Sequence, residues 1–368
     1  MNNLFFIQEK CRDKIKENLK SDGILIASPS SNPDYNYYWI RDAALVFRCL
    51  IDSPILNSSL LKQYIHNEKK LQGLKTLSGL GEPKYNVDMT SFNGDWGRPQ
   101  NDGPALRGLN MIRLYNYYIT LNDLENEIIL KDILDVLYND IHYTLTNYDR
   151  PCFDLWEEIN GWHFYTRVVQ IKFIKESMKF IKEHKLKFCY QKLNKVYHEL
   201  LKKLRHHTEN NYIISSFDTN GNIKKINDSS IVMAVCHVNF DSDILSIAKI
   251  DKIYRNITDI VLDFSKKYSK ETYGMVGRYK NDVYFGGHIW IICSLCLVQF
   301  YIYYYMKYSN PHCLQKAKHI INFVSKIDSN MDIAEQYDIE HSRQVSAERL
   351  SWNYSELYFC CKSFKNIL

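Results

Sequence analysis

The chain has 368 residues, of which 45% are hydrophobic and 24% charged, and its formal net charge is +5. This length allows one large domain or two ordinary ones with a buried core. The small net charge, carried by scattered Lys and Arg residues, argues against nucleic acid as a partner. No apolar run approaches the ~20 residues of a membrane span. We therefore expect a monomer without nucleic-acid or membrane partners, and a cytoplasmic one because the N-terminal apolar stretch is too short for a signal peptide.

Helical periodicity dominates the sequence in chain order. Val168, Ile171 and Ile174, for example, recur at spacings of three and four. The predicted helices cover 3–19, 39–51, 56–72, 103–121, 123–142, 162–184, 186–206, 228–238, 242–268, 287–307, 309–326 and 346–364. Most are joined by short turns, which predicts antiparallel helical hairpins, and neither strand–helix alternation nor a fixed-period repeat is present.

Four connections are long: 73–102, 207–227, 269–286 and 327–345. Asn220-Gly221 in the second of them predicts a β-hairpin. Loops of this length inside a compact domain are usually functional. Twelve helices with alternating short and long connections predict a single all-α domain, 1–368. Its hairpins would form a closed ring with the long loops gathered at one end.

The ten cysteines do not follow a disulfide or zinc framework. Cys293 and Cys296 form a C-x-x-C inside an apolar run, which favours one face of a buried helix over a redox or metal site. We expect reduced thiols, no metal and no cofactor.

Tryptophans and acidic residues gather in or beside the long loops. In "SNPDYNYYWIRDAALV" (31–46), Trp39, Arg41 and Asp42 open a helix, where a cap and a surface pair are the simpler interpretation. In "GLGEPKYNVDMTSFNGDWGRPQNDGPALRG" (79–108), an exposed Trp among polar residues suits a sugar, whose C–H face stacks on indole. The alternative is a loop that uses Trp96 as its own small core.

Two further stretches supply separated carboxylates. "FDLWEEINGWHFYT" (153–166) places Glu157 beside Trp156 and Glu158, and "DIAEQYDIEHSRQVSAERLSWNYSELY" (332–358) holds Glu335 in a loop. Glycoside hydrolysis needs one carboxylic acid and a second carboxylate. An apolar wall and neighbouring acids raise the pKa of a carboxyl, as a general acid requires, and Glu157 has such neighbours. Taken singly, Glu335 or its neighbour Asp338 is more simply a solvated surface group.

These segments, together with "GRYKNDVYFGGHIW", resemble the signature segments of glycoside hydrolase family 15, the glucoamylase family, in family order over residues 31–357. The resemblance implies an (α/α)6 barrel. It also implies inverting hydrolysis that releases β-glucose from the non-reducing ends of α-glucans, without a cofactor. We expect no starch-binding module and no N-terminal β-domain beside the matching segments.

The resemblance also implies a role for each matching residue. Glu157 matches the general acid and Glu335 the general base. The residues expected to bind substrate are Tyr35, Trp39, Arg41, Asp42, Lys84, Trp96, Arg98, Asp102, Trp156, Glu158, Arg278 and Trp352. Glu158, pointing away from its neighbour, is expected to be a supporting or subsite residue.

Three alternatives remain at this point. The same mechanism can serve trehalose, isomaltose or dextran. The domain can also be a catalytically silent glucan-binding or regulatory unit, or a helical ring for protein interactions. Substitutions such as "YFGGHIW", with a Gly-Gly pair at 286–287, bear on the outer subsites and leave both glutamates in place.

Overall fold

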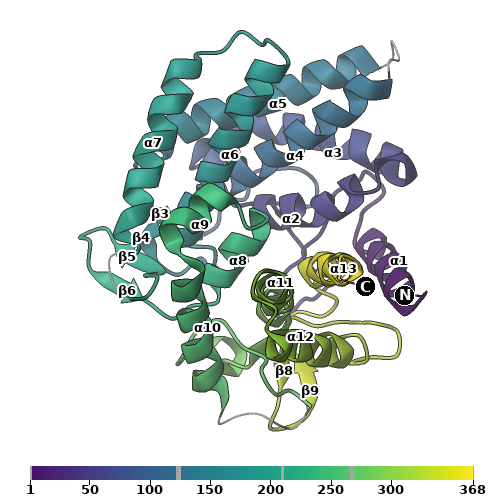
Figure 1. Cartoon of the computed structure of the whole chain (residues 1–368). Helices are drawn as coiled ribbons and strands as arrows, with labels where there is room; N and C mark the ends of the chain where they lie inside the picture. The colour runs from purple at the N-terminus through teal and green to yellow at the C-terminus, as the bar shows by residue number, and fades with distance from the viewer. Residues whose placement is uncertain (1, 122–125, 209–210, 266–268, 270, 368) are drawn as a thin grey trace.

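The computed structural model describes residues 2–121, 126–208, 211–265, 269 and 271–367, and these are mainly helical (Figure 1). Thirteen α-helices lie within the described residues. They are α1 (Asn2–Glu17), α2 (Ile40–Ile51), α3 (Ser58–Gln72), α4 (Gly103–Tyr118), α5 (Asn126–Asn147), α6 (Phe164–Glu183), α7 (Tyr190–His206), α8 (Ser230–His237), α9 (Ser242–Ala248), α10 (Ile250–Ser265), α11 (Ile291–Tyr308), α12 (Pro311–Val324) and α13 (Ser351–Lys365).

Six of these helices form a closed inner ring. In the order α2, α4, α6, α8, α11 and α13, each helix contacts the next, and α13 contacts α2. An outer helix packs on each inner one: α3 with α2, α5 with α4, α7 with α6, α10 with α8, α12 with α11 and α1 with α13. This is an (α/α)6 barrel, so the predicted all-α ring of hairpins is confirmed.

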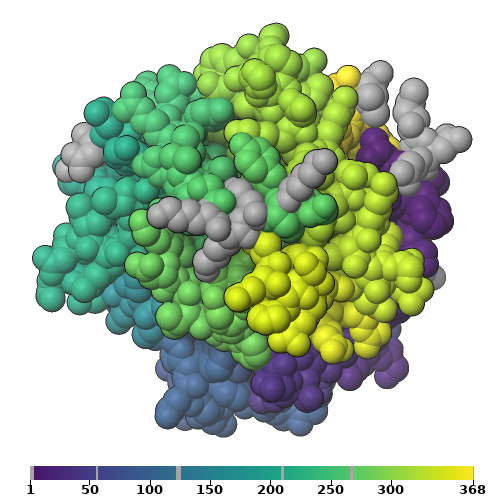
Figure 2. Space-filling view, turned by 90° about the horizontal axis from the view of Figure 1, so that it is seen from below, coloured from purple at the N-terminus to yellow at the C-terminus, as the bar shows by residue number. Residues whose placement is uncertain are grey.

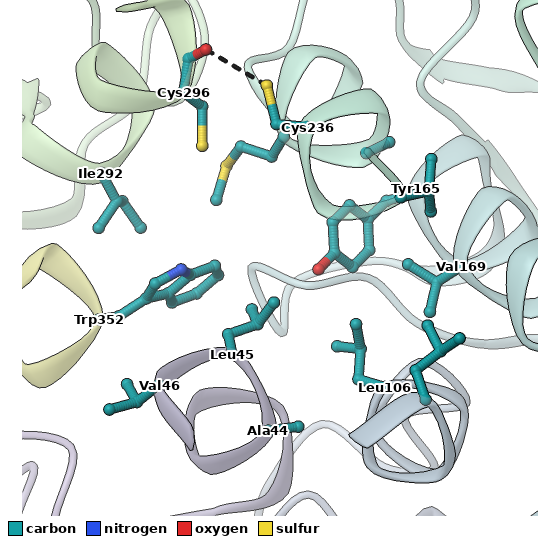
Figure 3. Close-up of a cluster of buried hydrophobic side chains, with 14 of the residues drawn as sticks. Ala44, Leu45, Val46, Leu106, Tyr165, Val169, Cys236, Ile292, Cys296 and Trp352 are labelled. Atoms are coloured by element: carbon teal, nitrogen blue, oxygen red, sulfur yellow. Dashed lines mark hydrogen bonds between the residues drawn. The ribbon is translucent and has the colours of Figure 1, made fainter. Parts of the chain in front are cut away.

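Apolar side chains fill the axis of the ring. Figure 3 shows them converging from all six inner helices, with Leu45, Leu106 and Val169 among them. Every residue of α2 is buried, whereas the outer helix α10 buries one stripe that includes Ile253, Ile257 and Ile260. A helix surrounded on all sides must be apolar around its circumference, and a helix facing solvent needs one apolar face only.

Short antiparallel strands stand at the entrance to the inner helices. They are β1 (Tyr38–Trp39), β2 (Lys84–Tyr85), β3 (Cys152–Phe153), β4 (Asn160–His163), β5 (Ser216–Asp218), β6 (Ile223–Lys225), β7 (Ile289–Trp290), β8 (Gln336–Asp338) and β9 (Arg343–Val345). β1 pairs with β2, β3 to β6 form one sheet in chain order, and β7 to β9 form another. Because β1, β4 and β7 run directly into α2, α6 and α11, the long loops lie at this end of the barrel.

The predicted hairpin at Asn220-Gly221 is confirmed as the β5–β6 connection, in which Gly221 has φ +83°. The C-x-x-C also behaves as expected, because Cys293 and Cys296 are buried free thiols in α11. Among the described residues, no helix combines the length and apolarity that a membrane crossing requires.

Several helix boundaries differ from prediction. The helix expected at 242–268 is divided into α9 and α10 at Lys249, whose φ of +61° cannot continue a right-handed helix. The helix expected at 287–307 begins only at Ile291, because Gly286 and Gly287 have φ of +91° and +61° and the next residues form β7. The expected positions 123–125 and 266–268 lie outside the described residues.

The two ends of the chain meet. α1 packs against α13, and the N and C labels of Figure 1 lie close together. The loop before α2 also touches the loop before α13, where the backbone N–H of Ser351 donates to the oxygen of Ala27 at 2.9 Å. Purple N-terminal and yellow C-terminal segments accordingly adjoin on the face shown in Figure 2.

Candidate active site

A cavity of about 290 Å³ opens among the loops where the inner helices begin. The predicted site residues that line it are Tyr35, Trp39, Arg41, Asp42, Trp96, Trp156, Glu157, Glu158, Arg278, Glu335 and Trp352. The two glutamates, far apart in sequence, therefore face one space. Its lining also includes Tyr284, Trp290 and Ile292.

A tight turn between β3 and β4 separates the paired glutamates. The N–H of Glu157 donates to the backbone oxygen of Asp154 at 2.9 Å. The Asp154 carboxylate accepts the N–H groups of Glu158 and Ile159 at 2.8 and 2.9 Å. Glu157 itself has φ +67°, a left-handed conformation that is costly for a residue with a Cβ. This turn sends the side chains of Glu157 and Glu158 to different partners.

Glu157 is held by one of its two carboxyl oxygens. Its Oε1 accepts from the indole N–H of Trp39 and the amide of Gln100, each at 3.0 Å, and from Nη2 of Arg41 at 3.3 Å. Its Oε2 makes no hydrogen bond to the described residues. The surroundings thus contain three hydrogen-bond donors, where the sequence suggested an apolar wall and acids. The arrangement fixes the carboxyl and leaves one oxygen for a ligand.

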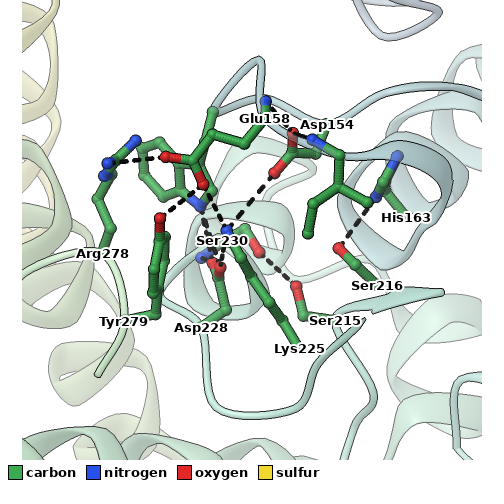
Figure 4. A network of polar contacts seen from close by, with 12 residues as sticks. Asp154, Glu158, His163, Ser215, Ser216, Lys225, Asp228, Ser230, Arg278 and Tyr279 are labelled. Carbon is green, nitrogen blue, oxygen red and sulfur yellow. Dashed lines mark hydrogen bonds and ion pairs between the residues drawn. The ribbon is translucent and has the colours of Figure 1, made fainter. Parts of the chain in front are cut away.

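Glu158 joins a separate polar network (Figure 4). Its Oε1 lies 2.9 Å from Nη2 of Arg278. Its Oε2 accepts from Lys225 at 2.7 Å and from the hydroxyl of Tyr279 at 2.6 Å. Arg278 is also held by Asp282 at 2.6 and 2.7 Å. Glu158 therefore fixes the Arg278 guanidinium at the edge of the cavity, and Figure 4 shows both acidic and basic members converging there.

Glu335 lies at the start of β8 and is 2% exposed. The backbone anchors it, since its N–H donates to Ala347 and its carbonyl accepts from Ile291. The Ser346 hydroxyl donates to its Oε2. Burial raises the pKa of Glu335 from its ordinary 4.5 to about 7, and the hydrogen bond from Ser346 offsets part of that rise. This carboxyl can exchange a proton near neutral pH.

Arg41 and Asp42 begin α2 directly after β1. Nη1 of Arg41 donates to Gln100 at 2.7 Å and to Asp102 at 3.2 Å. Its Nε is buried 4.0 Å from the Asp42 carboxylate and has no hydrogen-bond partner among the described residues. Burial raises the pKa of Asp42 to about 7, against the lowering effect of Arg41. The Nε1 of Trp290 is likewise buried without a partner among the described residues. Unpaired donors lining a cavity suit a hydroxylated ligand.

Three predicted site residues do not line the cavity. Asp102 is fully buried behind Arg41 as its ion-pair partner. Arg98 holds its own loop, with Nε on Glu82 at 2.9 Å and Nη1 on the oxygen of Gly94 at 2.9 Å. Lys84 is 2% exposed, and its ammonium lies beneath aromatic rings, 3.3 Å from the ring centroid of Trp96. Each of them supports a residue that does line the cavity.

Sequence reasoning missed Gln100, Tyr284 and Trp290. Gln100 lies in "WGRPQND" and bridges Arg41 to Glu157. The hydroxyl of Tyr284 lies 2.8 Å from that of Tyr35. Their segments were visible as Gly- and Trp-rich loops, but their contacts depend on chain segments remote in sequence.

Metal-ligating geometry occurs once among the described residues, at His237, Cys296 and Glu356. This group lies in the buried core and does not line the cavity. Arg48 forms an ion pair with Glu356, and Gln299 donates to it at 2.7 Å. A guanidinium already neutralises the carboxylate there, so the donor set does not fit a cation.

Comparison with known proteins matches the sequence profile described as "Glycosyl hydrolases family 15" to residues 7–311. The chain is 31% identical over 301 residues to "Glucoamylase-1" of Schizophyllum commune, covering 76% of this chain and 51% of that protein. It is 28% identical over 384 residues to "Probable glucoamylase" of Schizosaccharomyces pombe, covering 91% and 83%. The chain thus spans about half the length of the first relative and most of the second.

Solved structures agree. The family 15 glucoamylase from Hypocrea jecorina superposes with a TM-score of 0.83 at 25% identity, over 97% of this chain and 71% of that one. The glucoamylase from Saccharomycopsis fibuligera has the same fold, with a TM-score of 0.84 at 22% identity over 99% and 95%. The profile match over most of the sequence, together with these structures, establishes that the chain belongs to glycosyl hydrolases family 15.

Proposed function

We propose that this chain is an inverting, exo-acting α-glucoside hydrolase that releases β-D-glucose from non-reducing ends of α-glucans such as maltodextrin and glycogen. The observation that carries the proposal is the pair of carboxyls on one cavity. Glu157 is fixed by one oxygen, and Glu335 is buried with a pKa of about 7. Family membership and the glucoamylase relatives support the same activity.

In the proposed reaction, Glu157 donates its proton to the glycosidic oxygen while the bond to the anomeric carbon breaks. Glu335 removes a proton from a water that attacks the opposite face of that carbon. The leaving chain departs as an alcohol, and glucose of inverted configuration remains. An inverting pair leaves room for the water, with carboxyls roughly 6.5–9.5 Å apart.

The shape of the cavity supports exo action. Ile292 and Trp352, which line it, are also part of the packed axis of the barrel, as Figure 3 shows. A floor closed by inner-helix side chains admits the end of a chain and blocks its continuation. Arg41 and Asp42, at the start of the inner helix α2, line the same cavity and would bind the hydroxyls of the terminal sugar.

Substitutions assign the two roles. Glu157→Gln should abolish hydrolysis of maltotriose and retain activity on α-glucosyl fluoride, whose leaving group needs little protonation. Glu335→Gln should lose activity on both substrates. Because Glu335 carries the raised pKa, the reversed pattern would exchange the roles, and full activity of either variant on maltotriose would refute the proposal.

Linkage and location complete the proposal. A panel of maltotriose, trehalose, isomaltose and dextran, followed by NMR of the anomeric proton, tests for preferred release of β-glucose from α-1,4 linkages. Binding of these glucans without turnover would instead indicate a silent glucan-binding domain. We propose a cytoplasmic location, which agrees with the name of one relative, the "Glucoamylase, intracellular sporulation-specific" of Saccharomyces cerevisiae, 36% identical over 180 residues that cover 44% of this chain and 32% of that protein. Immunofluorescence of the native protein tests this.

A further inference from the structure

A second cavity, of about 610 Å³, lies toward the other ends of the inner helices. Three inner helices line both cavities, with residues seven positions apart. The paired positions are Arg41 and Arg48 on α2, Ile292 and Gln299 on α11, and Trp352 and Phe359 on α13. At 1.5 Å per helical residue, the two cavities are about 10 Å apart along the barrel axis.

A layer of hydrogen bonds separates the two spaces. Glu356 accepts from Trp352 Nε1 at 2.9 Å on the catalytic side. On the other side it pairs with Arg48 and accepts from Gln299, both of which line the second cavity. The second cavity is therefore a distinct compartment, and substrate in the catalytic pocket does not extend into it.

Arg113 supplies the second cavity with a guanidinium that has no direct partner among the described residues. Its side chain is exposed. Desolvation by the surrounding protein and the charge of Arg48 lower its pKa, and the more distant carboxylates of Asp52 and Glu176 offset part of that lowering. No hydrogen bond or ion pair joins it to any residue that the structure describes. The other two cations of the cavity are neutralised, Arg48 by Glu356 and Lys362 by Asp52.

The helix dipole accounts for the positions of Arg48 and Lys362, but it does not account for the position of Arg113. Arg48 and Lys362 lie in the last turns of α2 and α13, where positive side chains offset the partial negative charge of the helix end. Arg113 lies five residues before the end of α4, whose last turn holds no basic residue. The unpaired guanidinium of Arg113 is therefore available to a ligand. A guanidinium can bind a phosphate group through two parallel N–H···O hydrogen bonds.

The rest of the lining suits a sugar. Side-chain amides and a hydroxyl can exchange hydrogen bonds with sugar hydroxyls, and aromatic rings can cover C–H faces. These groups are Asn116, Asn239, Asn366, Ser363, Tyr117, Phe240 and Phe359. We propose that the second cavity binds a sugar phosphate, with Arg113 holding the phosphate group, and that this site is separate from the catalytic pocket.

Calorimetric titration with ribose 5-phosphate tests the proposal on the intact protein. The test variant is Arg113→Gln. The matched control is Arg255→Gln, which removes the same charge from an exposed position on α10 outside both cavities. We expect wild type and Arg255→Gln to bind equally, and Arg113→Gln to bind at least about tenfold more weakly, because a charge-assisted contact is lost.

Two further probes define the ligand class. Ribose alone should not bind detectably, and inorganic phosphate should bind more weakly than ribose 5-phosphate. Circular dichroism and Tm should be unchanged in both variants, since both side chains are exposed. Failure of ribose 5-phosphate to bind wild type, equal weakening in the two variants, or equal affinity for inorganic phosphate would each overturn the proposal.

Discussion

Glu335→Gln tests the electrostatics of the cavity through stability. Burial raises the pKa of Glu335 above its ordinary value, so the folded protein holds this proton more tightly than the unfolded chain. Ionising Glu335 therefore costs stability as the pH rises from 4.5 to about 7. Each pKa unit corresponds to about 1.4 kcal/mol, so the full cost is roughly 3 kcal/mol above pH 7 and vanishes below pH 4.5. Neutral Gln avoids that cost.

Urea denaturation at pH 4.5 and pH 8 measures the effect, with Glu340→Gln as a control that removes the same charge from an exposed loop position. We expect Glu335→Gln to match wild type within about 0.5 kcal/mol at pH 4.5 and to be more stable by about 2–3 kcal/mol at pH 8. The control should show no such pH dependence. A variant that is equally or less stable than wild type at pH 8 would refute the argument that burial of this carboxyl is uncompensated.

Three other substitutions test packing and charge contacts in the fold. Lys84→Ala removes an ammonium within 4.8 Å of four ring centroids, and should cost about 2 kcal/mol in calorimetry and raise KM with little change in kcat. An unchanged Tm would show that the four aromatic rings keep their packing without the Lys84 ammonium. Gly161→Ala would place a Cβ 1.9 Å from the backbone oxygen of Phe217 and should lower the free energy of unfolding by about 3 kcal/mol. In the control Gly73→Ala the nearest atom would be 3.3 Å away, and stability should change by less than about 1 kcal/mol. Similar Tm values for the two variants would contradict the close approach of β4 and β5 at Gly161. Glu356→Gln leaves Arg48 buried without its anion, and a loss of about 3–5 kcal/mol in urea denaturation is expected; a neutral effect would exclude a structural role for this pair.

The barrel was predictable because its signal is repeated many times. The inner helix α2 is buried along its whole length and the outer helix α10 has an apolar stripe, and similar patterns recur along the chain. A local error such as the missed break at Lys249 therefore leaves the topology unchanged. The two glutamates were predictable from the resemblance of their segments to family 15. No local feature of the 177 residues between them shows that the fold brings the two glutamates together.

The partners of the site residues were not predictable. Arg98 and Asp102 occur in a loop typical of substrate contact, yet one holds its loop and the other lies behind Arg41. The environment of Glu158 depends on Lys225 and Arg278, which arrive from two other loops. Such assignments depend on the direction of each side chain in the folded state, and sequence spacing does not encode it.

The turn that separates Glu157 from Glu158 also limits how the gene can change. The backbone oxygen of Asp154 accepts the N–H of Glu157, and its carboxylate accepts those of Glu158 and Ile159. These hydrogen bonds fix the number of residues between Asp154 and Ile159. A one-residue insertion or deletion there would present the neighbouring glutamate, or none, to Arg41. Length variation among homologues is therefore not expected in the glutamate turn.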